Sequence, residues 1–451
     1  MQHVSQDNFV LNGPILSSFV KIAVPSMIGF VSISSAAVVD GIFVGNYLGS
    51  QSLAAINLLM PMLTFVFGIA FMFAVGGSVR AGKYIGEHDF TAASSIFSKT
   101  LITCFFIGII IVVASLTFDR AIYQAMGATQ QLYPLMAQYF LAYVPFLVVE
   151  LVAIGLFYFI RLDGFANLAA VGLTIGALMN VILDYIFIVK LDLGLTGAGL
   201  ATGLSQILSL LILITYFSKK NRKLKILYDP KNWFEILQSA YNGLSEFINE
   251  VSGGVVAFLL NWIIITSIGV EGVAAITIIN YLILMAMMMN FSVSEAVQVF
   301  VSQNFGANNR QRIVRFMQVS FMACFFISAV CLTLLLGFTD PIIHVFLDDD
   351  AEQAAALASD FVYTLWPIFI FNGISITISA YLTAIHHAKA SAVLALSRSL
   401  ILPCGLLAIF YYFISSFSFL WALPVAEIIT FMVAVTLFFR FHPNKIMSDK
   451  H

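Results

Sequence analysis

The sequence predicts an all-α polytopic membrane protein with twelve transmembrane helices in two pseudo-symmetric six-helix lobes. Its 451 residues are 61% hydrophobic and 10% charged, with a mean hydropathy of +0.98, whereas a soluble domain carries about 25% charged residues. Apolar stretches long enough to cross a bilayer recur along the chain. The two halves of the sequence also repeat each other, which predicts the two lobes.

The first half contains six stretches that we expect to span the membrane, since each can cross a hydrocarbon core of about 30 Å. The polar arm before the first stretch lacks the basic region and cleavage site of a signal peptide, so we expect the first helix to be retained. The six lie near residues 16–40, 51–75, 95–118, 133–159, 167–189 and 195–217.

The second half contains six further stretches, and a basic segment separates them from the first six. They lie near residues 239–267, 272–300, 314–337, 355–384, 391–413 and 417–440. We therefore expect an N-lobe over 1–217 that carries the ion site, a linker over 218–238, a C-lobe over 239–440 and a tail over 441–451. Twelve spans place both termini on one side of the membrane.

The linker is expected to be cytoplasmic, because loops rich in Lys and Arg stay inside the cell. Its basic residues are Lys219, Lys220, Arg222, Lys223, Lys225 and Lys231. Other loops predicted on that side carry Arg80, Lys83, Arg310 and Lys389. The sequence thus predicts a multi-pass protein of the cytoplasmic membrane with both termini inside, and a solvated linker facing lipid headgroups rather than nucleic acid.

The repeat is visible residue by residue. IGVEGVAAITII from Ile268 repeats LGSQSLAAINLL from Leu48, so that Gly49 matches Gly269 and Gly86 matches Gly306. Two lobes of like orientation are typical of transporters that bind near the midplane and alternate access by rocking one lobe against the other. A channel would need a selectivity filter or a ring of charge, which the sequence does not suggest.

Asn180 and Asp184 are four residues apart in an apolar segment, so they lie on one face of a predicted helix. A carboxylate at membrane depth costs at least a few kcal/mol and marks a candidate functional site. The alternative is a structural hydrogen-bonding pair between packed helices. The repeat favours function, since shifting Asp40 by 220 positions gives Leu260 and leaves the acids in one lobe only.

Three stretches of the sequence resemble one known family of membrane proteins. PSMIGFVSISSAAVVDGIFVGNYLGSQSLAA from Pro25 and NVILDYIFIVKLDLGLTGAGLATGLSQ from Asn180 resemble the multidrug and toxic compound extrusion (MATE) family, and NGLSEFINEVSGGVVAFLLNWIII from Asn242 resembles its bacterial DinF-like branch. The resemblance covers nearly the whole chain. It implies a bending proline at Pro25 and an ion-coupling site of Asp40, Asn180, Asp184, Tyr139 and Thr202.

The expected coupling ion is H⁺, because two carboxylates that share a desolvated site cannot both ionise cheaply. Na⁺ is the alternative, since oxygens of Asp40, Asn180, Asp184 and Thr202 could ligate a hard cation. Family members with a second-lobe cation site use an acid on the tenth helix, where this chain has Asn372. No other metal site and no cofactor are expected.

Other polar residues lie deep in predicted helices and are either structural or line a cavity: Glu150, Glu246, Glu250, Glu295, Arg398 and Glu427. A buried arginine needs a carboxylate, so Arg398 is expected to pair with one of the second-lobe glutamates. Asp163 is expected to form a solvated pair with Arg161 at the cytoplasmic end of its helix.

The sequence therefore predicts an ion-driven antiporter that exports amphipathic organic compounds, and not an enzyme. It lacks a Walker motif, a nucleophile elbow and an HExxH motif. A lipid or lipid-linked-sugar flippase of the same wider superfamily is the alternative, although such a protein would need several basic residues facing its cavity. We expect a monomer that contacts membrane lipids and binds no nucleic acid.

Overall fold

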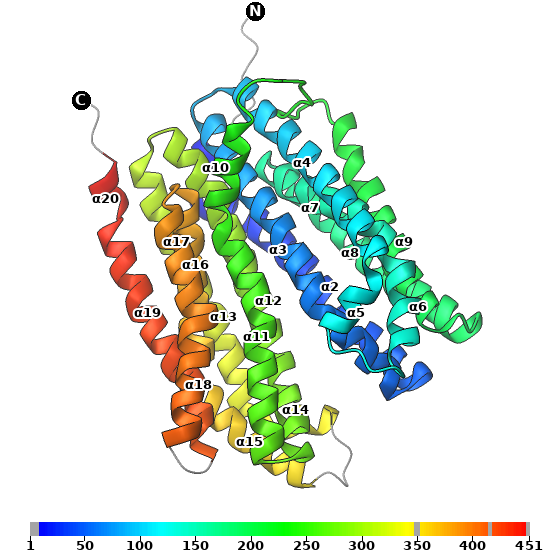
Figure 1. The fold of residues 1–451 in the computed structure, drawn as a ribbon. Helices are drawn as coiled ribbons and strands as arrows, with labels where there is room; N and C mark the ends of the chain where they lie inside the picture. The colour runs from blue at the N-terminus through cyan, green and yellow to red at the C-terminus, as the bar shows by residue number, and fades with distance from the viewer. Residues whose placement is uncertain (1–8, 347–351, 414–416, 448–451) are drawn as a thin grey trace, which may run out of the picture.

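The computed structural model describes residues 9–346, 352–413 and 417–447, and these ranges form a bundle of long helices (Figure 1). In the part of the chain that the structure describes, eleven helices are long and apolar enough to cross a membrane, and a bent pair, counted as one span, gives twelve. These ranges contain helices and no strands, in agreement with the predicted fold class.

The first half follows the predicted spans closely. Its elements are α1 (Phe9–Asn12), α2 (Ile15–Phe43), η1 (Val44–Leu48), α3 (Ser50–Gly86), α4 (Phe90–Thr117), α5 (Asp119–Ala125), α6 (Tyr133–Tyr143), η2 (Val144–Phe146), α7 (Leu147–Leu162), α8 (Ala166–Asp184), η3 (Tyr185–Lys190), α9 (Gly194–Ile214) and η4 (Thr215–Ser218). Arg80 and Lys83, which were expected in a loop, lie in the last turns of α3.

The second half has a similar succession of long helices. Its elements are α10 (Phe234–Asn242), α11 (Leu244–Ser267), α12 (Val270–Gly306), α13 (Arg310–Gly337), α14 (Thr339–Phe346), α15 (Glu352–Leu365), α16 (Ile368–Ala384), α17 (Ala388–Leu396), η5 (Ser397–Ile401), α18 (Leu402–Phe413), η6 (Phe417–Trp421), α19 (Ala422–Arg440) and α20 (Pro443–Ile446). The seventh predicted span is broken at Gly243, and the tenth bends by 50° at Trp366–Pro367, where the proline cannot continue the hydrogen bonding of α15.

Two pairs of equivalent helices in the two halves have equal lengths. α3 and α12 each contain 37 residues, and α4 and α13 each contain 28. Gly49 and Gly269 precede α3 and α12 with φ of 85° and 101°, a conformation that favours glycine. Asp89 and Asn309 cap α4 and α13 through their side chains. The repeat seen in the sequence thus extends to turn geometry and helix capping.

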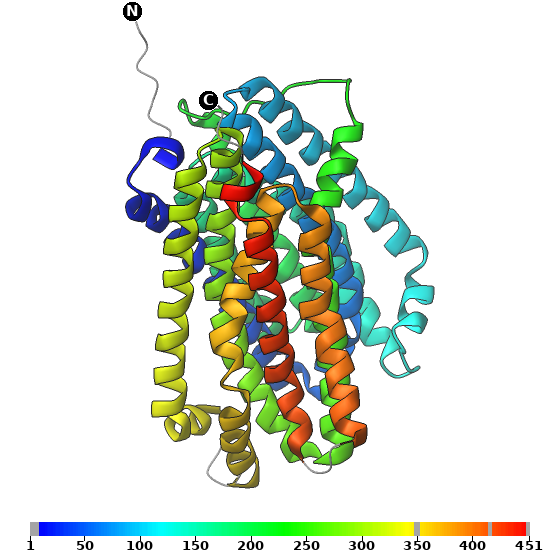
Figure 2. The ribbon, with the colours of Figure 1, turned by 90° about the vertical axis from the view of Figure 1, so that its left-hand side faces the viewer.

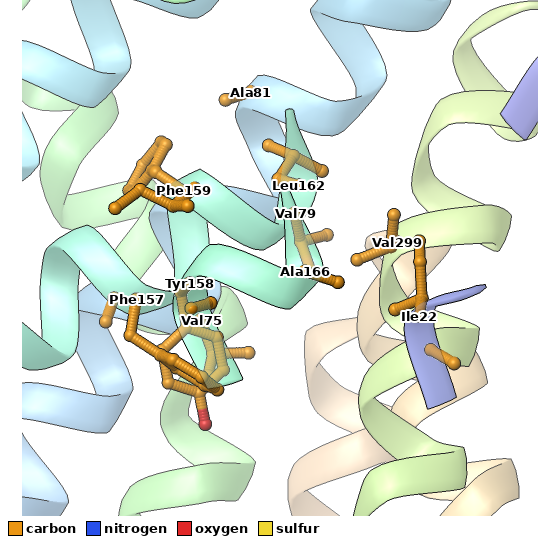
Figure 3. Packing of buried hydrophobic residues seen from close by; sticks show 14 of the residues in the cluster. Ile22, Val75, Val79, Ala81, Phe157, Tyr158, Phe159, Leu162, Ala166 and Val299 are labelled. Atoms are coloured by element: carbon orange, nitrogen blue, oxygen red, sulfur yellow. The ribbon is translucent and has the colours of Figure 1, made fainter. Parts of the chain in front are cut away.

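The helices form two groups, α2 to α9 and α11 to α19, which meet toward one end of the molecule (Figure 1). We call this the basic end, since it carries α1, α20 and the linker (Figure 1, Figure 2). There one hydrophobic core is shared between the groups and includes Ile22, Val75 and Phe157 from the first and Val299 from the second (Figure 3). Further from this end, each group has its own separate core.

Glycines allow the backbones of α3 and α12 to touch at the basic end. A Cβ atom on Gly86 would overlap the carbonyl oxygen of Gln303, and one on Gly306 would overlap that of Lys83. Lys83 and Gln303 are themselves 220 positions apart, as are the two glycines. The contact is therefore symmetric about the axis that relates the lobes.

Part of the linker backbone is docked on the first lobe, although most of the linker side chains are exposed, as expected of a solvated loop. The amides of Lys225 and Leu227 donate to Ser94 and Ser98 of α4 at 3.1 and 2.8 Å. Asp229 accepts from Ser95 at 2.7 Å and pairs with Lys99 at 2.9 Å. Polar side chains on α4, which the apolar pattern of that segment concealed, hold the linker in place.

Candidate functional site

The two predicted acids, Asp40 and Asp184, lie together inside the first lobe. Asp40 is on α2 and Asp184 ends α8, two helices that pack against each other. Their carboxyl groups interact electrostatically, and Asp184 is completely buried. No hydrogen bond of regular geometry reaches either oxygen of Asp184 or Oδ1 of Asp40. An unsatisfied buried carboxyl is costly, which marks this pair as a place for a proton or a cation.

Both acids stand next to π-helical turns. The π-helical turn η1 begins four residues after Asp40, and η3 begins directly after Asp184. π-helical turns are rare in proteins overall, and those that occur are often located at functional sites. In the described residues the third π-helical turn, η5, contains Arg398, the deep arginine of the second lobe. All three irregular turns are thus associated with ionisable groups.

Two of the three expected neighbours complete this cluster. Tyr139 on α6 is 4% exposed and interacts with both aspartates. The Thr202 side chain on α9 lies within hydrogen-bonding reach of Tyr139, and its hydroxyl donates to the carbonyl of Ala198 at 3.0 Å. Asn180 lies one turn before Asp184, but its buried amide nitrogen has no hydrogen-bond partner in the described structure. Its predicted contact with the acids is therefore not observed.

Glu150 extends the same interior network. Its carboxylate accepts a short hydrogen bond from Tyr143 and a bond of 3.2 Å from Gln206. The rings of Tyr143 and Tyr139 lie 5.7 Å apart, which connects Glu150 to the aspartates. Within the described ranges, no basic side chain contributes to the electrostatics of these three acids. Sequence reasoning missed Tyr143, although its spacing of four from Tyr139 places both on one face of α6.

The second lobe repeats the Glu150–Gln206 contact with the chemical roles exchanged. Asn372 on α16 donates to Glu427 on α19 at 2.8 Å. Asn372 follows Glu150 by 222 positions and Glu427 follows Gln206 by 221. The same helix pair in each lobe therefore carries one carboxylate and one carboxamide, with the acid on opposite helices.

Arg398 does not form the predicted ion pair. Within the described ranges it takes part in no salt bridge, and its guanidinium instead donates to Asn249 at 2.9 Å. It lies within electrostatic reach of Glu427 and Glu246, which are held by Asn372 and Gln298. Side-chain amides of neighbouring helices lie nearest to these charged groups. Arg398 therefore faces Glu246 and Glu427 without forming a salt bridge to either.

Glu295 and Arg161 form a pair that the sequence did not predict. They make a buried salt bridge between α12 and α7, in which both side chains are nearly inaccessible. Tyr158 also donates to Glu295 at 3.2 Å. The expected solvated pair of Arg161 with Asp163 is wrong, because α12 covers Arg161. Asp163 is buried as well and accepts from Tyr216 and the Lys223 amide at 2.6 and 2.8 Å.

The remaining candidates lie apart from these contacts. Glu250 is one turn beyond Glu246 on α11, and among the described residues its carboxylate has no hydrogen-bond or ion-pair partner. Pro25 lies inside the continuous helix α2, fifteen residues before Asp40. In the described ranges no three His, Cys, Asp or Glu side chains are close enough together to hold a metal ion.

Comparison with known proteins identifies the architecture. The family model described as MatE matches residues 25–186 and 254–409, one stretch in each lobe. The chain belongs to the MatE family. This membership confirms the resemblance drawn from the sequence and makes the chain a multi-pass membrane transporter rather than an enzyme; assignment to the DinF-like branch stays a prediction.

Relatives match the MatE chain over almost its whole length. The multidrug export protein MepA of Staphylococcus haemolyticus (strain JCSC1435) is 24% identical over 443 residues, which are 97% of this chain and 96% of that protein. The MepA protein of Staphylococcus aureus (strain NCTC 8325 / PS 47) is 23% identical over 94% of this chain and 93% of its own length.

Solved structures of similar fold support the same architecture. One, described as the outward-facing conformation of a multidrug resistance MATE family transporter, has a TM-score of 0.90 and 23% identity, and 99% of each chain is covered. A second transporter, from Pyrococcus furiosus, has a TM-score of 0.90 and 22% identity over 99% of this chain and 100% of its own; its description refers to reversed polarity of the binding pocket.

Proposed function

We propose that this MatE transporter exports amphipathic organic compounds in exchange for protons. One observation supports the choice of the proton: Asp40 and Asp184 interact inside the first lobe, and none of the described basic side chains balances their charge. Two carboxyls in one desolvated site favour a shared proton over two negative charges. The multidrug export activity named for the MepA relatives supports the substrate class.

The proposed orientation places the basic end in the cytoplasm. The linker, the last turns of α3 and the first turns of α13 carry most of the Lys and Arg residues of that end, as cytoplasmic segments do. The protein is then a monomer of the cytoplasmic membrane with both termini inside. Since the lobes share a core at the basic end and have separate cores elsewhere, this conformation is open toward the outside.

Exchange follows from the two protonation states of the pair. With the carboxyls protonated, the site is nearly neutral and the lobe can be rearranged without moving a buried charge. Release of the proton leaves an anion that Tyr139 and Thr202 can partly stabilise by hydrogen bonding. The substrate is expected to be selected loosely, because apolar contacts discriminate poorly between ligands of similar shape.

Everted vesicles in sodium-free buffer provide the test. Adding a transported dye should release protons from wild-type vesicles, and Asp40→Asn and Asp184→Asn should each abolish this release. The double variant should be no worse than either single one, because coupled carboxyls act as a unit. Asp192→Asn is the matched control: this exposed residue has φ of 51°, which asparagine also tolerates. Efflux that needs sodium, without any pH change, would overturn the proton assignment.

A further inference from the structure

A pocket of about 720 Å³ lies between the lobes at the basic end, away from the carboxylate pair. Arg80 of α3 lines it from the first lobe, α10 lines one side, and the turn between α16 and α17 lines it from the second lobe. Its volume is that of a small-molecule site. Any ligand bound there would contact both lobes at once.

The pocket is built for an anion. Arg80 and Lys389 line it together with His386 and His387, and no Asp or Glu is among the described residues that do so. Two carboxylates at this end have partners outside the lining: Glu235 accepts from Tyr84 at 3.4 Å, and Glu87 lies 3.8 Å from Lys83. The lining thus has an excess of positive charge.

Hydrogen-bond donors without an acceptor also line the pocket. Ala388, Lys389 and Ala390 are the first residues of α17 and all line the pocket, and N–H groups in the first turn of a helix have no intrahelical acceptor. Nε of Arg80 and Nε2 of His386 are buried without a hydrogen-bond partner. Burial and the charges of Lys83 and Arg80 lower the pKa of His386 to about 3, so its ring is neutral at pH 7.

The rim of the pocket is apolar and exposed. Phe234, Leu237 and Tyr241 of α10 are 67%, 60% and 49% exposed and lie on one face of that helix. α10 precedes the transmembrane helix α11, where the chain enters the apolar layer (Figure 1). An exposed aromatic and aliphatic face at this level is typical of a helix that lies in the membrane interface.

We propose that this pocket binds the phosphate headgroup of an anionic phospholipid, with the acyl chains against the exposed face of α10. Arg80, Lys389 and the first turn of α17 would hold the phosphate oxygens. Because the site includes residues of both lobes, the lipid would stabilise the arrangement in which the lobes meet at the basic end and would be released when they separate there.

Native mass spectrometry of the purified full chain tests the site without relying on transport. Dioleoylphosphatidylglycerol should bind wild-type protein with higher affinity than dioleoylphosphatidylcholine. Lys389→Gln should weaken binding of phosphatidylglycerol about five-fold, the effect of removing one basic contact. Lys445→Gln is the matched control, since this exposed lysine lies at the same end but outside the pocket, and it should bind as wild type does.

Two further arms distinguish the alternatives. Arg80→Lys keeps the charge and should retain most of the binding that Arg80→Gln loses, which separates headgroup contact from loss of folding. Glycerol 1-phosphate should bind far more weakly than the lipid, because it lacks acyl chains. Equal binding of phosphatidylglycerol by Lys389→Gln and Lys445→Gln would overturn the site, and equal binding of glycerol 1-phosphate would overturn the lipid as its ligand.

Discussion

A buried carboxylate is costly unless it is hydrogen-bonded, paired with a positive charge or neutralised by a proton, and none of the described basic side chains contributes to the electrostatics of Asp184. Asp40, Tyr139 and Thr202 offer hydrogen bonds and a second acid instead. Basic residues elsewhere in the interior are already engaged: Arg161 pairs with Glu295. This difference distinguishes a carboxyl group that can bind and release a proton, such as that of Asp184, from one that stabilises the structure in an ion pair, such as that of Glu295.

Asp163 allows a pH-dependent prediction outside the membrane-spanning segments. Burial raises its pKa from 3.8 to about 6, although the Tyr216 hydroxyl and the Lys223 amide favour the charged form. Because the folded-state pKa is the higher one, the stabilisation from proton binding is full below about pH 4 and is lost as pH rises through about 6. Wild type should therefore lose on the order of 2 kcal/mol of stability between pH 4 and pH 7.5 relative to Asp163→Asn.

Chemical unfolding in detergent at the two pH values measures this difference. Asparagine suits the site, because both hydrogen bonds reach the same oxygen, Oδ2, while Oδ1 has no partner. Asp192→Asn at the exposed end of η3 should keep the wild-type pH dependence. An Asp163→Asn protein whose stability changes with pH as much as that of wild type would exclude this carboxyl as the titrating group.

The acids of the first lobe could be predicted from the sequence. A single Asp in an apolar helix is energetically costly whatever its tertiary contacts, so the helical pattern alone indicates it. The partners of Arg161 and Arg398 could not be predicted in this way. Arg161 meets Glu295 only because side chains of α12 reach the end of α7, and Arg398 meets Asn249 only because η5 packs against α11. Which of several deep glutamates lies nearest depends on helix rotation, which the hydrophobic pattern does not define.

The helices themselves were largely predictable, since hydrophobic length defines each span. The ends of α3 and α12 were not, because both continue beyond the apolar stretch into polar sequence that packs between the lobes. The docking of the linker was not predictable for a related reason: its lysines indicated solvent, where most of them lie, but gave no sign that its backbone amides bond to serines of α4.

Close packing of α3 on α12 predicts that Gly86→Ala will separate the lobes at the basic end. The added methyl group would overlap the carbonyl oxygen of Gln303, which is backbone and cannot move aside alone. In a cysteine-free background, the reaction of Ser302→Cys with a water-soluble thiol reagent should become at least about ten-fold faster. This corresponds to a decrease of about 1.4 kcal/mol in the free energy of the opening that exposes the thiol.

Gly253→Ala is the control for this experiment, because a Cβ atom there has open space around it. It should leave the labelling rate of Ser302→Cys unchanged, as the added methyl group meets no neighbour. Equal rates in the Gly86→Ala and Gly253→Ala proteins would contradict the view that backbone contact at Gly86 keeps this end closed.

A second prediction at the scale of the helix concerns a bend of α2 at Pro25. Proline cannot donate to the carbonyl of Lys21, which leaves a weak point in α2 well before Asp40. We expect α2 to bend there when the carboxylate pair changes its protonation. Pro25→Ala should insert and fold normally but export dye several-fold more slowly in everted vesicles; wild-type efflux at equal expression would remove the bend from the mechanism.

For the whole molecule, the Arg161–Glu295 pair should govern the balance between conformations. Removing one partner of a buried salt bridge costs about 3–5 kcal/mol, since the other charge stays unpaired. Glu295→Gln and Arg161→Gln should each lower the thermal stability of the conformation described here and increase labelling of Ser302→Cys. The double variant should be less destabilised than the sum of the two, and strict additivity would show that the pair does not connect the lobes.

The exchanged positions of acid and amide in the two lobes have an electrical consequence. Among the described residues, no basic side chain contributes to the electrostatics of Glu150, Asp40 or Asp184, whereas Glu427 and Glu246 face Arg398. The first lobe would then change its net charge when protons bind and leave. A charge that moves through the membrane potential gains or loses about 2.3 kcal/mol per 100 mV. Efflux should therefore respond to a potassium–valinomycin voltage applied at constant pH, and Asp184→Asn should remove that response.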